Sequence, residues 1–413
     1  MKRALFCALL LALGWLYWTF ISATSQPAYP RTVYWIRAAE CARATGKYLV
    51  VCDASDGVRP IEDVSLADDR GHTLLLSLYA RLTNTAPTES SLRNLNLAIS
   101  LFGFLVFVCV LIRAELWRSA IFAAALGSYW LGARGGPDVD AVYMGIAAMS
   151  ASALLISIRE KSLWSLVAVF FLLTFTALIR EPVGLGAAAA LFISAIAQPF
   201  VLKSRGRKDL WRAALLIVIV LAAMKVPSLP TRIRDAQLGT HATGTAAHGL
   251  SHNLFLGLGG FVENKWGIVW DDAFAEHLMM KLHPEIAYCS DAYFSAIGKL
   301  YWSYVKEDPA EALRVYMVKT VRTFSSAEGL AWSGFISLGL MVAIFIFARH
   351  RKLNWSLQTN FGAMATVLFA FSFFAQGILT HPAWNYIHPG PILLMIACAM
   401  ISERVLFPST KAS

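Results

Sequence analysis

The sequence has few charged residues for its length, and this scarcity excludes most soluble folds. Of its 413 residues, 15% are Asp, Glu, Lys or Arg, whereas 57% are hydrophobic. A soluble domain carries about a quarter charged residues and about half apolar ones. The balance is typical of a protein whose surface is largely covered by lipid.

Motifs of several common protein classes are also missing. The sequence contains no P-loop, no dinucleotide-binding fingerprint and no tandem repeat. It lacks a Cys-x-x-Cys pair and any His/Cys cluster with zinc spacing, so a structural zinc is not expected. The formal charge of +10 does not indicate a nucleic-acid partner, because the basic residues lie at the ends of apolar runs, where topology selection places them. In an oxidising compartment, Cys41 and Cys52 could close a small loop.

What the sequence does have is a series of apolar runs, each long enough to cross a bilayer as a helix. The runs are continuously apolar and lack the alternation of a barrel strand. The first run, Ala4 to Ala23, is longer than a signal core and carries aromatic residues where a cleavage site needs small ones, so we expect a retained helix. We predict an all-α polytopic membrane protein with about ten transmembrane helices and two outer loops that bear short helices. The later runs are Leu97–Ile112, Leu116–Leu131, Ala141–Ile158, Leu163–Ile179, Val183–Leu202, Trp211–Val226, Leu330–Ala348, Leu357–Leu379 and Pro391–Ser402.

Two polar stretches divide the chain. The first contains two short helical patterns, Val33–Ala44 and Gly71–Leu82, and the second is long enough to form a small folded cap. The predicted division is 1–24 for the first transmembrane helix, 25–94 for the first outer loop with its acidic cluster, 95–226 for transmembrane helices 2–7, 227–326 for the large outer loop, and 327–413 for transmembrane helices 8–10 and a cytoplasmic tail.

Basic residues fall on alternate connections between the predicted helices. If Met1-Lys2-Arg3 is cytoplasmic, every later basic cluster is cytoplasmic too, as positive-inside sorting requires. The short outer connections hold only Arg134 and Arg180. We therefore predict that both termini are cytoplasmic and that both polar stretches face outward. The clusters contain Arg113 and Arg118; Arg159 and Lys161; Lys203, Arg205, Arg207, Lys208 and Arg212; Arg349, Arg351 and Lys352; and Arg404 and Lys411.

Acids, an arginine and a histidine gather at the end of the first outer loop, in Asp68, Asp69, Arg70 and His72. One interpretation is helix capping, in which Asp68 or Asp69 accepts backbone N–H bonds at the start of the following helix. The other is a carboxylate general base at the bilayer surface, with Arg70 and His72 contacting an anionic group. The two are compatible, because a capping geometry also fixes a catalytic carboxylate.

Further charged and aromatic residues lie at the predicted outer ends of helices. Arg180 and Glu181 either form an interfacial pair or bind a phosphate through the arginine, which the glutamate orients. His381, Tyr386 and His388 precede the last helix. Tyr belongs to the interfacial belt, but two histidines at that depth are harder to explain structurally.

The large loop carries histidines, glycines, aromatic residues and acids. Such a stretch is either an irregular cap packed on its own aromatics or a sugar site, in which aromatic faces contact sugar rings and carboxylates bind hydroxyls. The candidates for sugar or acceptor binding are His252, Asn253, Trp270, Asp271 and Asp272.

These features, in this order, resemble the GT-C superfamily of membrane glycosyltransferases, especially the bacterial protein O-mannosyltransferase and aminoarabinose-transferase group. The acidic cluster and the large late loop carry the likeness. So does Glu307-Asp308-Pro309-Ala310-Glu311, which leads to Lys319 and Phe324 and is similar to the Asn-Pro-led helix of that group. Tyr386-Ile387-His388-Pro389-Gly390-Pro391 is similar to its Arg-Tyr-x-x-Pro ending.

The resemblance implies transfer of a sugar from a polyprenyl-phosphate-linked donor to a glycan, lipid or protein acceptor, at the periplasmic face of a bacterial inner membrane. A carboxylate of the first outer loop, Asp69 or Asp68, would deprotonate the acceptor. These acids follow Ala23 by more than forty residues, whereas the family's acids commonly follow the first helix closely, so the identity of the base stays open. Arg70, Arg180 and the outer histidines would bind the donor phosphate. No cofactor is certain, and a divalent cation is left open.

Two other functions use similar features. A glycan polymerase or ligase acting on lipid-linked oligosaccharide shares the topology and the outer Arg and His residues. A flippase or transporter of lipid-linked sugars needs polar groups at mid-membrane depth, and the predicted spans are nearly free of charge.

Overall fold

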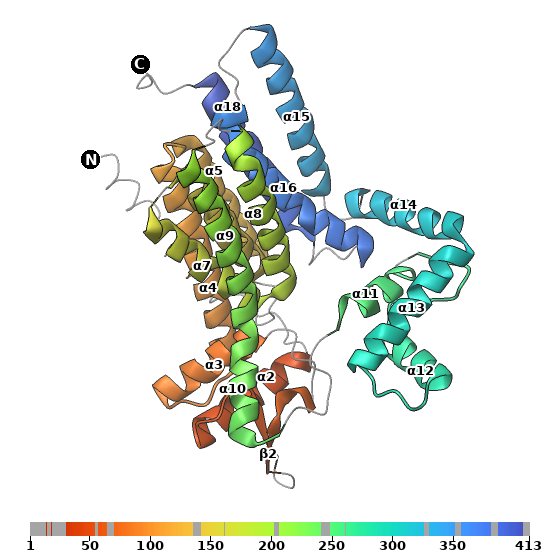
Figure 1. Cartoon of the computed structure of the whole chain (residues 1–413). Coiled ribbons are helices and arrows are strands. Elements are labelled where there is room, and N and C mark those ends of the chain that lie inside the picture. Colours follow the sequence, from red (N-terminus) through yellow and green to blue (C-terminus); the bar gives the residue numbers. More distant parts are fainter. Residues whose placement is uncertain are drawn as a thin grey trace.

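The computed structural model describes residues 14, 18, 30–53, 57–63, 70–134, 142–160, 162–201, 206–240, 248–260, 262–325, 330–351, 357–380 and 387–407. Most of these residues are helical, and the longest helices form a bundle (Figure 1). The predicted first helix, Ala4 to Ala23, lies outside the described residues except for two helical positions, Gly14 and Trp18.

The bundle consists of apolar helices that match the predicted runs. By length and composition, six helices among the described residues are able to cross a membrane, and α6 and α7 are shorter apolar helices. This confirms the prediction of a polytopic, helical membrane protein. The bundle helices are α4 (Glu89–Arg113), α5 (Trp117–Arg134), α6 (Tyr143–Arg159), α7 (Leu163–Ile179), α8 (Glu181–Val201), α9 (Arg207–Lys225), α15 (Leu330–His350), α16 (Leu357–Leu379) and α18 (Pro389–Leu406).

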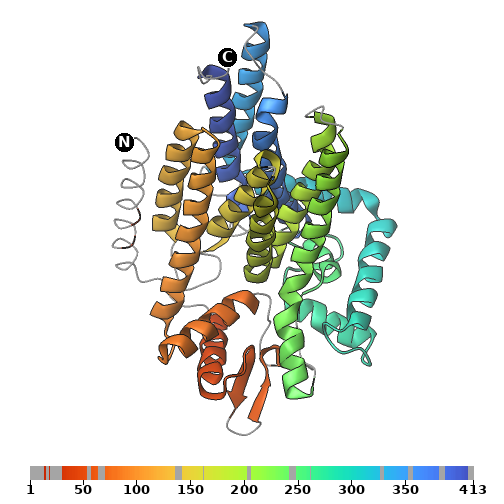
Figure 2. The same ribbon diagram turned by 60° about the vertical axis from the view of Figure 1, so that its left-hand side comes forward.

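Small residues allow the central helices to pack closely. A Cβ added at Gly103 of α4 would overlap the carbonyl of Gly145 in α6, and one added at Gly145 would overlap the backbone of Ser100. Lipid tails are as apolar as the side chains of the helices, so the hydrophobic effect does not drive membrane helices together. Their association depends on close van der Waals packing instead. As a result α6 is buried along nearly its whole length, inside the other helices of the bundle (Figure 2).

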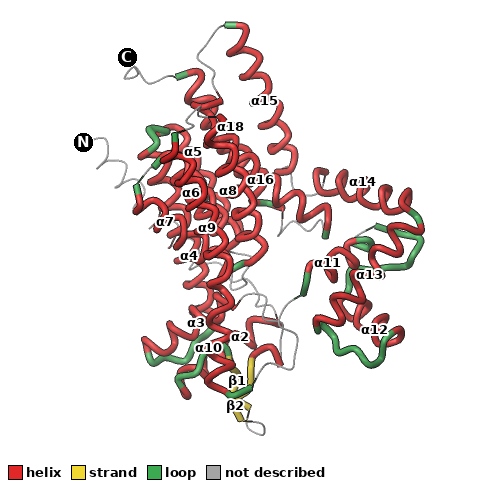
Figure 3. Tube along the Cα trace, viewed as in Figure 1, coloured by secondary structure: helices red, strands yellow, loops and turns green. Residues whose placement is uncertain are grey.

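At one end of the bundle lies a small unit formed by the first polar stretch. Its elements are α2 (Pro30–Thr45), β1 (Val50–Asp53), β2 (Gly57–Pro60), the short helix η1 (Ile61–Asp63) and α3 (Arg70–Thr83). The helices α2 and α3 match the two predicted patterns. The antiparallel hairpin of β1 and β2, shown as two strands in Figure 3, was not predicted from the sequence. A disulfide joins Cys41 to Cys52, as the sequence allowed.

A long helix connects this unit to the bundle. From Arg207, α9 continues through η3 (Val226–Ser228) into α10 (Leu229–Leu238). In α10, Arg234 forms a buried ion pair with Glu62 of η1, and both side chains are at most 2% exposed. The predicted division between residues 226 and 227 therefore falls within a continuous helix.

The second polar stretch forms a separate helical unit beside the bundle, which we call the cap (Figure 1). It contains α11 (Leu250–Gly257), α12 (Asp272–Leu282), α13 (Asp291–Glu307) and α14 (Pro309–Ser325). Phe255, Ile268, Tyr293 and Ile297 are among the residues of its own apolar core.

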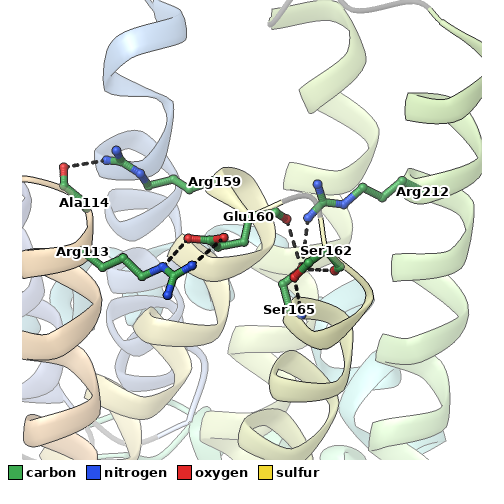
Figure 4. Close-up of polar contacts among 7 residues, drawn as sticks. All are labelled: Arg113, Ala114, Arg159, Glu160, Ser162, Ser165 and Arg212. Carbon is green, nitrogen blue, oxygen red and sulfur yellow. Dashed lines mark hydrogen bonds and ion pairs between the residues drawn. The ribbon is translucent and has the colours of Figure 1, made fainter.

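The opposite end of the bundle holds Arg113, Arg159 and Arg212, which belong to three of the predicted basic connections, and we call it the basic end (Figure 4). Arg113 binds Glu160 through two hydrogen bonds of 2.6 and 3.2 Å. Arg159 donates to the carbonyl of Ala114, and Arg212 donates to the carbonyl of Ser157. Charged ends of α4, α6 and α9 therefore lie on one side, as the alternation of basic clusters predicts.

Candidate functional site

The end of the bundle away from the basic end brings several predicted site residues together. A Cβ added at Gly71, in the first turn of α3, would overlap the carbonyl oxygen of Leu178 in the last turn of α7. The glycine therefore lets α3 begin directly against the end of α7. Arg70 stands just before Gly71 and Arg180 just after α7, so both arginines belong to this junction. Asp68 and Asp69, the predicted bases, precede Arg70 but lie outside the described residues.

Arg180 is fixed by an aromatic partner. Its side chain is about 5% exposed, and its Nε donates a 2.5 Å hydrogen bond to the hydroxyl of Tyr143, the first residue of α6. The guanidinium carbon also lies 5.0 Å from the centroid of the Tyr143 ring. On a second side, the ring of buried His388 meets Tyr143 edge-on at 6.2 Å. Two predicted donor-site residues, Arg180 and His388, thus meet around a tyrosine that sequence reasoning did not single out.

The backbone adds positive potential to the same end. The helices α3, α6, α8 and α18 all begin here, at Arg70, Tyr143, Glu181 and Pro389. Each helix N-terminus carries a partial positive charge of about half an electron and presents backbone N–H groups. Together with the two arginines, this geometry suits an anionic group such as a phosphate. Glu181 opens α8 with an exposed carboxylate at the edge of the cluster.

His72 serves the packing of the small unit. Its side chain is fully buried, its Nε2 hydrogen-bonds the amide oxygen of Asn96, and its ring meets Trp35 edge-on at 4.7 Å. The imidazole is therefore enclosed between α2, α3 and α4. His381 and Tyr386, the remaining residues predicted at the donor site, lie outside the described residues.

Three of the five predicted sugar-binding residues take part in the folding of the cap. Asp271 caps α12 by accepting a 3.0 Å hydrogen bond from the backbone N–H of Ala273. Asn253 donates to the carbonyls of His248 and Gly249 at the start of α11. Trp270 is partly buried against the apolar core of the cap.

The other two, His252 and Asp272, form a pair that includes a third residue. Asp272 Oδ1 lies 3.1 Å from His252 Nε2, and Asp272 Oδ2 lies 3.6 Å from His248 Nε2. Partial burial acts to raise the pKa of Asp272, but the hydrogen bond with His252 and the nearby charge of His248 lower it below its usual value. Among the described residues, these three form a group able to hold a metal ion. This group was not predicted from the sequence, because His248 lies before α11 and Asp272 lies twenty residues after His252.

Comparisons with known proteins identify similar folds only among solved structures. No family model matches the sequence, and no curated protein matches it significantly. Two crystal structures of ArnT from Cupriavidus metallidurans are similar to this chain, one in the apo state and one bound to undecaprenyl phosphate. Identities are 15% and 14%, each TM-score is 0.40, and the matches cover 98% and 97% of this chain and 78% and 77% of the other. At these values the similarity concerns the overall arrangement of the chain alone.

Proposed function

We propose that the chain is an integral-membrane glycosyltransferase of the GT-C type. It transfers a sugar from a polyprenyl-phosphate-linked donor to a glycan, lipid or protein acceptor at the outer, periplasmic face of a bacterial inner membrane. One observation carries the proposal: Arg180 is buried at the end of an apolar bundle, held by Tyr143 beside His388. A lipid-linked phosphate needs this combination, because its tail must stay in hydrocarbon while its charge needs cations at the interface.

Burying the charge of an arginine near hydrocarbon costs free energy. Ionisable residues near hydrocarbon are rare, and they tend to mark pathways and binding sites. A guanidinium presents a planar fork of donors that matches two oxygens of a phosphate. The hydroxyl of Tyr143 takes one donor, Nε, and thereby fixes the plane of the fork.

The chemistry requires charge neutralisation at the donor and a base at the acceptor. The leaving group is already a phosphate, so stabilising its developing charge matters more than protonating it. Arg180, Arg70 and the helix N-termini would supply that stabilisation. Asp69 or Asp68, immediately before α3, would take the proton of the acceptor hydroxyl as it attacks the anomeric carbon.

The proposed orientation places the basic end in the cytoplasm. Arg113, Arg159 and Arg212 gather at that end, as positive-inside sorting favours. A single cysteine replacing the exposed Lys208, in a background without other cysteines, should react only with reagents that cross the membrane. Labelling of that cysteine from outside would reverse the orientation and move the site to the cytoplasmic face.

Donor binding and transfer test the proposed activity. The purified chain in lipid nanodiscs should bind a polyprenyl monophosphate and consume labelled sugars attached to that carrier. A matched set of polyprenyl diphosphate sugars distinguishes the alternative, because a glycan polymerase or ligase would use the diphosphate donors instead. Absence of binding to both carriers would overturn the proposal.

A further inference from the structure

The cap contains three side chains of types that bind metal ions, and they lie close together in space. His248 precedes α11, His252 lies in its first turn, and Asp272 begins α12. One nitrogen from each histidine and one oxygen from Asp272 all lie within 4.8 Å of one another. We propose that His248, His252 and Asp272 bind a divalent transition-metal ion of the zinc type. This site does not depend on the proposed glycosyltransferase activity.

The spacing of the ligand atoms fits one ion. Two ligand atoms bound at about 2.0–2.1 Å to a tetrahedral zinc lie roughly 3.4 Å from each other. Asp272 Oδ1 and His252 Nε2 are 3.1 Å apart, and Asp272 Oδ2 and His248 Nε2 are 3.6 Å apart. Both distances lie close to that value, but they end on different oxygens of the carboxylate, so Asp272 would bind one ion through both oxygens or turn to present one of them.

The arrangement of the rings also suits a shared ion. The two imidazole rings are stacked, with centroids 4.3 Å apart and planes 8° apart. Both rings have a nitrogen beside the carboxylate of Asp272. Imidazole and carboxylate groups are both ligands of zinc.

An outer hydrogen bond positions the buried ligand. His252 is fully buried, and its Nδ1 lies 2.7 Å from the hydroxyl of Tyr293. When Nδ1–H donates to that hydroxyl oxygen, the lone pair of Nε2 points toward Asp272. Histidine ligands of metal ions almost always donate their second ring N–H to such a partner. Tyr293 would therefore be a positioning residue for the site.

The donor set defines the class of ion and the shape of the site. Two imidazoles and one carboxylate favour zinc and its transition-metal neighbours over Mg²⁺ or Ca²⁺, which prefer oxygen ligands. Three protein ligands leave a fourth position of a tetrahedral ion for water or a substrate oxygen. The side chain of Asp272 is 53% exposed, which places the solvent side of the site at the carboxylate. The ion would also fasten α12 to α11.

The same distances are compatible with a metal-free arrangement, in which His252 Nε2–H donates a hydrogen bond to Asp272. The experiment must therefore measure the ion directly. The full chain, purified without a polyhistidine tag, is equilibrated with Zn²⁺ against a competing chromophoric chelator. We expect one tightly bound Zn²⁺ per chain, no comparable binding of Mg²⁺, and the intense visible absorption of tetrahedral Co²⁺ when cobalt replaces zinc.

Two variants and one control make the test specific. Asp272→Asn removes a ligand at an exposed position and should weaken Zn²⁺ binding by more than the about 10–100-fold expected for Tyr293→Phe. Asp271→Asn is the matched control, because asparagine also caps helices well and the residue lies next to the site. It should bind Zn²⁺ like the unchanged chain. Equal Zn²⁺ affinity in all three variants would mean an adventitious ion only, and less than one bound ion in the unchanged chain would equally overturn the proposal.

Discussion

Lys319 Nζ lies 2.7 Å from the carbonyl oxygen of Thr380, a residue 61 positions later, and 2.7 Å from the carbonyl oxygen of Gly257. The amine joins the end of α11 in the cap to the end of α16 in the bundle. A Cβ added at Gly257 would overlap the carbonyl oxygen of Leu379, so the two helix ends meet backbone to backbone. Lys319 therefore links the cap to the bundle through two hydrogen bonds.

The buried amine predicts an unusual pH dependence of stability. Burial lowers the pKa of Lys319 from its ordinary value of 10.5 to about 7. Between these values the unfolded chain binds a proton that the folded protein does not, so the free energy of unfolding rises with pH, by up to about 1.4 kcal/mol per pH unit. A neutral amine keeps two N–H groups, one for each carbonyl. We expect the thermal midpoint of the detergent-solubilised protein to rise between about pH 7 and about pH 10.

A pair of substitutions isolates this effect. Lys319→Met should flatten the rise of the midpoint with pH, because methionine fills similar space and does not titrate. Lys299→Met, at an exposed position of α13, should leave the rise unchanged. A rise that persists in Lys319→Met would assign the pH dependence to another group.

The donor site predicts a strong distinction between arginine and lysine. Arg180→Lys keeps the positive charge but loses the planar fork, so we expect binding of polyprenyl phosphate to weaken by about 10-fold or more. Tyr143→Phe should weaken binding less, because it removes only the hydroxyl that accepts from Arg180 Nε. Equilibrium binding in nanodiscs checks both, and thermal midpoints show whether the variants fold. Arg180→Ala combined with His388→Ala must abolish measurable binding if these residues contact the phosphate.

Asp69 and Asp68, which precede α3 in the sequence, are the predicted catalytic bases. Asp69→Asn, or else Asp68→Asn, should lower the rate of transfer by about 10²–10⁴-fold while donor binding stays intact. Asp63→Asn, on η1, is the comparison. If both neighbouring variants retain full activity and Asp63→Asn does not, the base is Asp63.

Hydropathy predicts the helices of the bundle well. A segment in lipid must pair its own backbone hydrogen-bonding groups, so each membrane-spanning helix corresponds to one continuous apolar run in the sequence. The run Leu163–Ile179 is a helix with those bounds. The hairpin of β1 and β2 was not predicted, since strands of four residues are too short to show a period.

The candidate sites follow the same logic. Arg180 attracts notice in the sequence because the short outer connections hold only one other basic residue, Arg134, and His388 does because histidine is unusual at the start of a span. Tyr143 does not, because tyrosine at an interface is ordinary. The pairing of Asp272 with His248 and His252 depends on how α12 folds back on α11, which no local pattern encodes. His72 stays a predicted donor-site residue, and the structure places its ring beside Asn96 and Trp35, a contact that no local pattern encodes either.

The junction of α3 and α7 predicts a position that tolerates no side chain. Gly71→Ala would force α3 away from the carbonyl of Leu178, and overpacking of this kind costs about 1–3 kcal/mol. Because Arg70 moves with α3, we also expect weaker donor binding. Gly339→Ala in α15 is the control, since no atom lies within 4 Å of the added Cβ and alanine favours a helix. A Gly71→Ala variant as stable as Gly339→Ala would contradict the packing described.

The buried ion pair between α10 and η1 predicts a large loss on removal of one partner. Glu62→Gln leaves the charge of Arg234 buried with less compensation, and we expect the free energy of unfolding to fall by about 3 kcal/mol. Asp53→Asn breaks an exposed pair with Arg59 and should cost about 0–1 kcal/mol. Denaturation in detergent and limited proteolysis of the small unit measure both. Equal losses would show that the Glu62 pair is as weak as a surface pair.

The helix from Arg207 to Leu238 has 32 residues, which corresponds to about 48 Å at the rise of an α-helix. A bilayer core is about 30 Å thick, so roughly a third of this helix extends beyond the hydrocarbon. Its far turn is fastened to the small unit by Arg234 and Glu62. In mechanical terms the helix is a strut of fixed length. The distance from the membrane-spanning part of this helix to the short helix η1, which carries Glu62, is therefore set by the fixed rise of the α-helix.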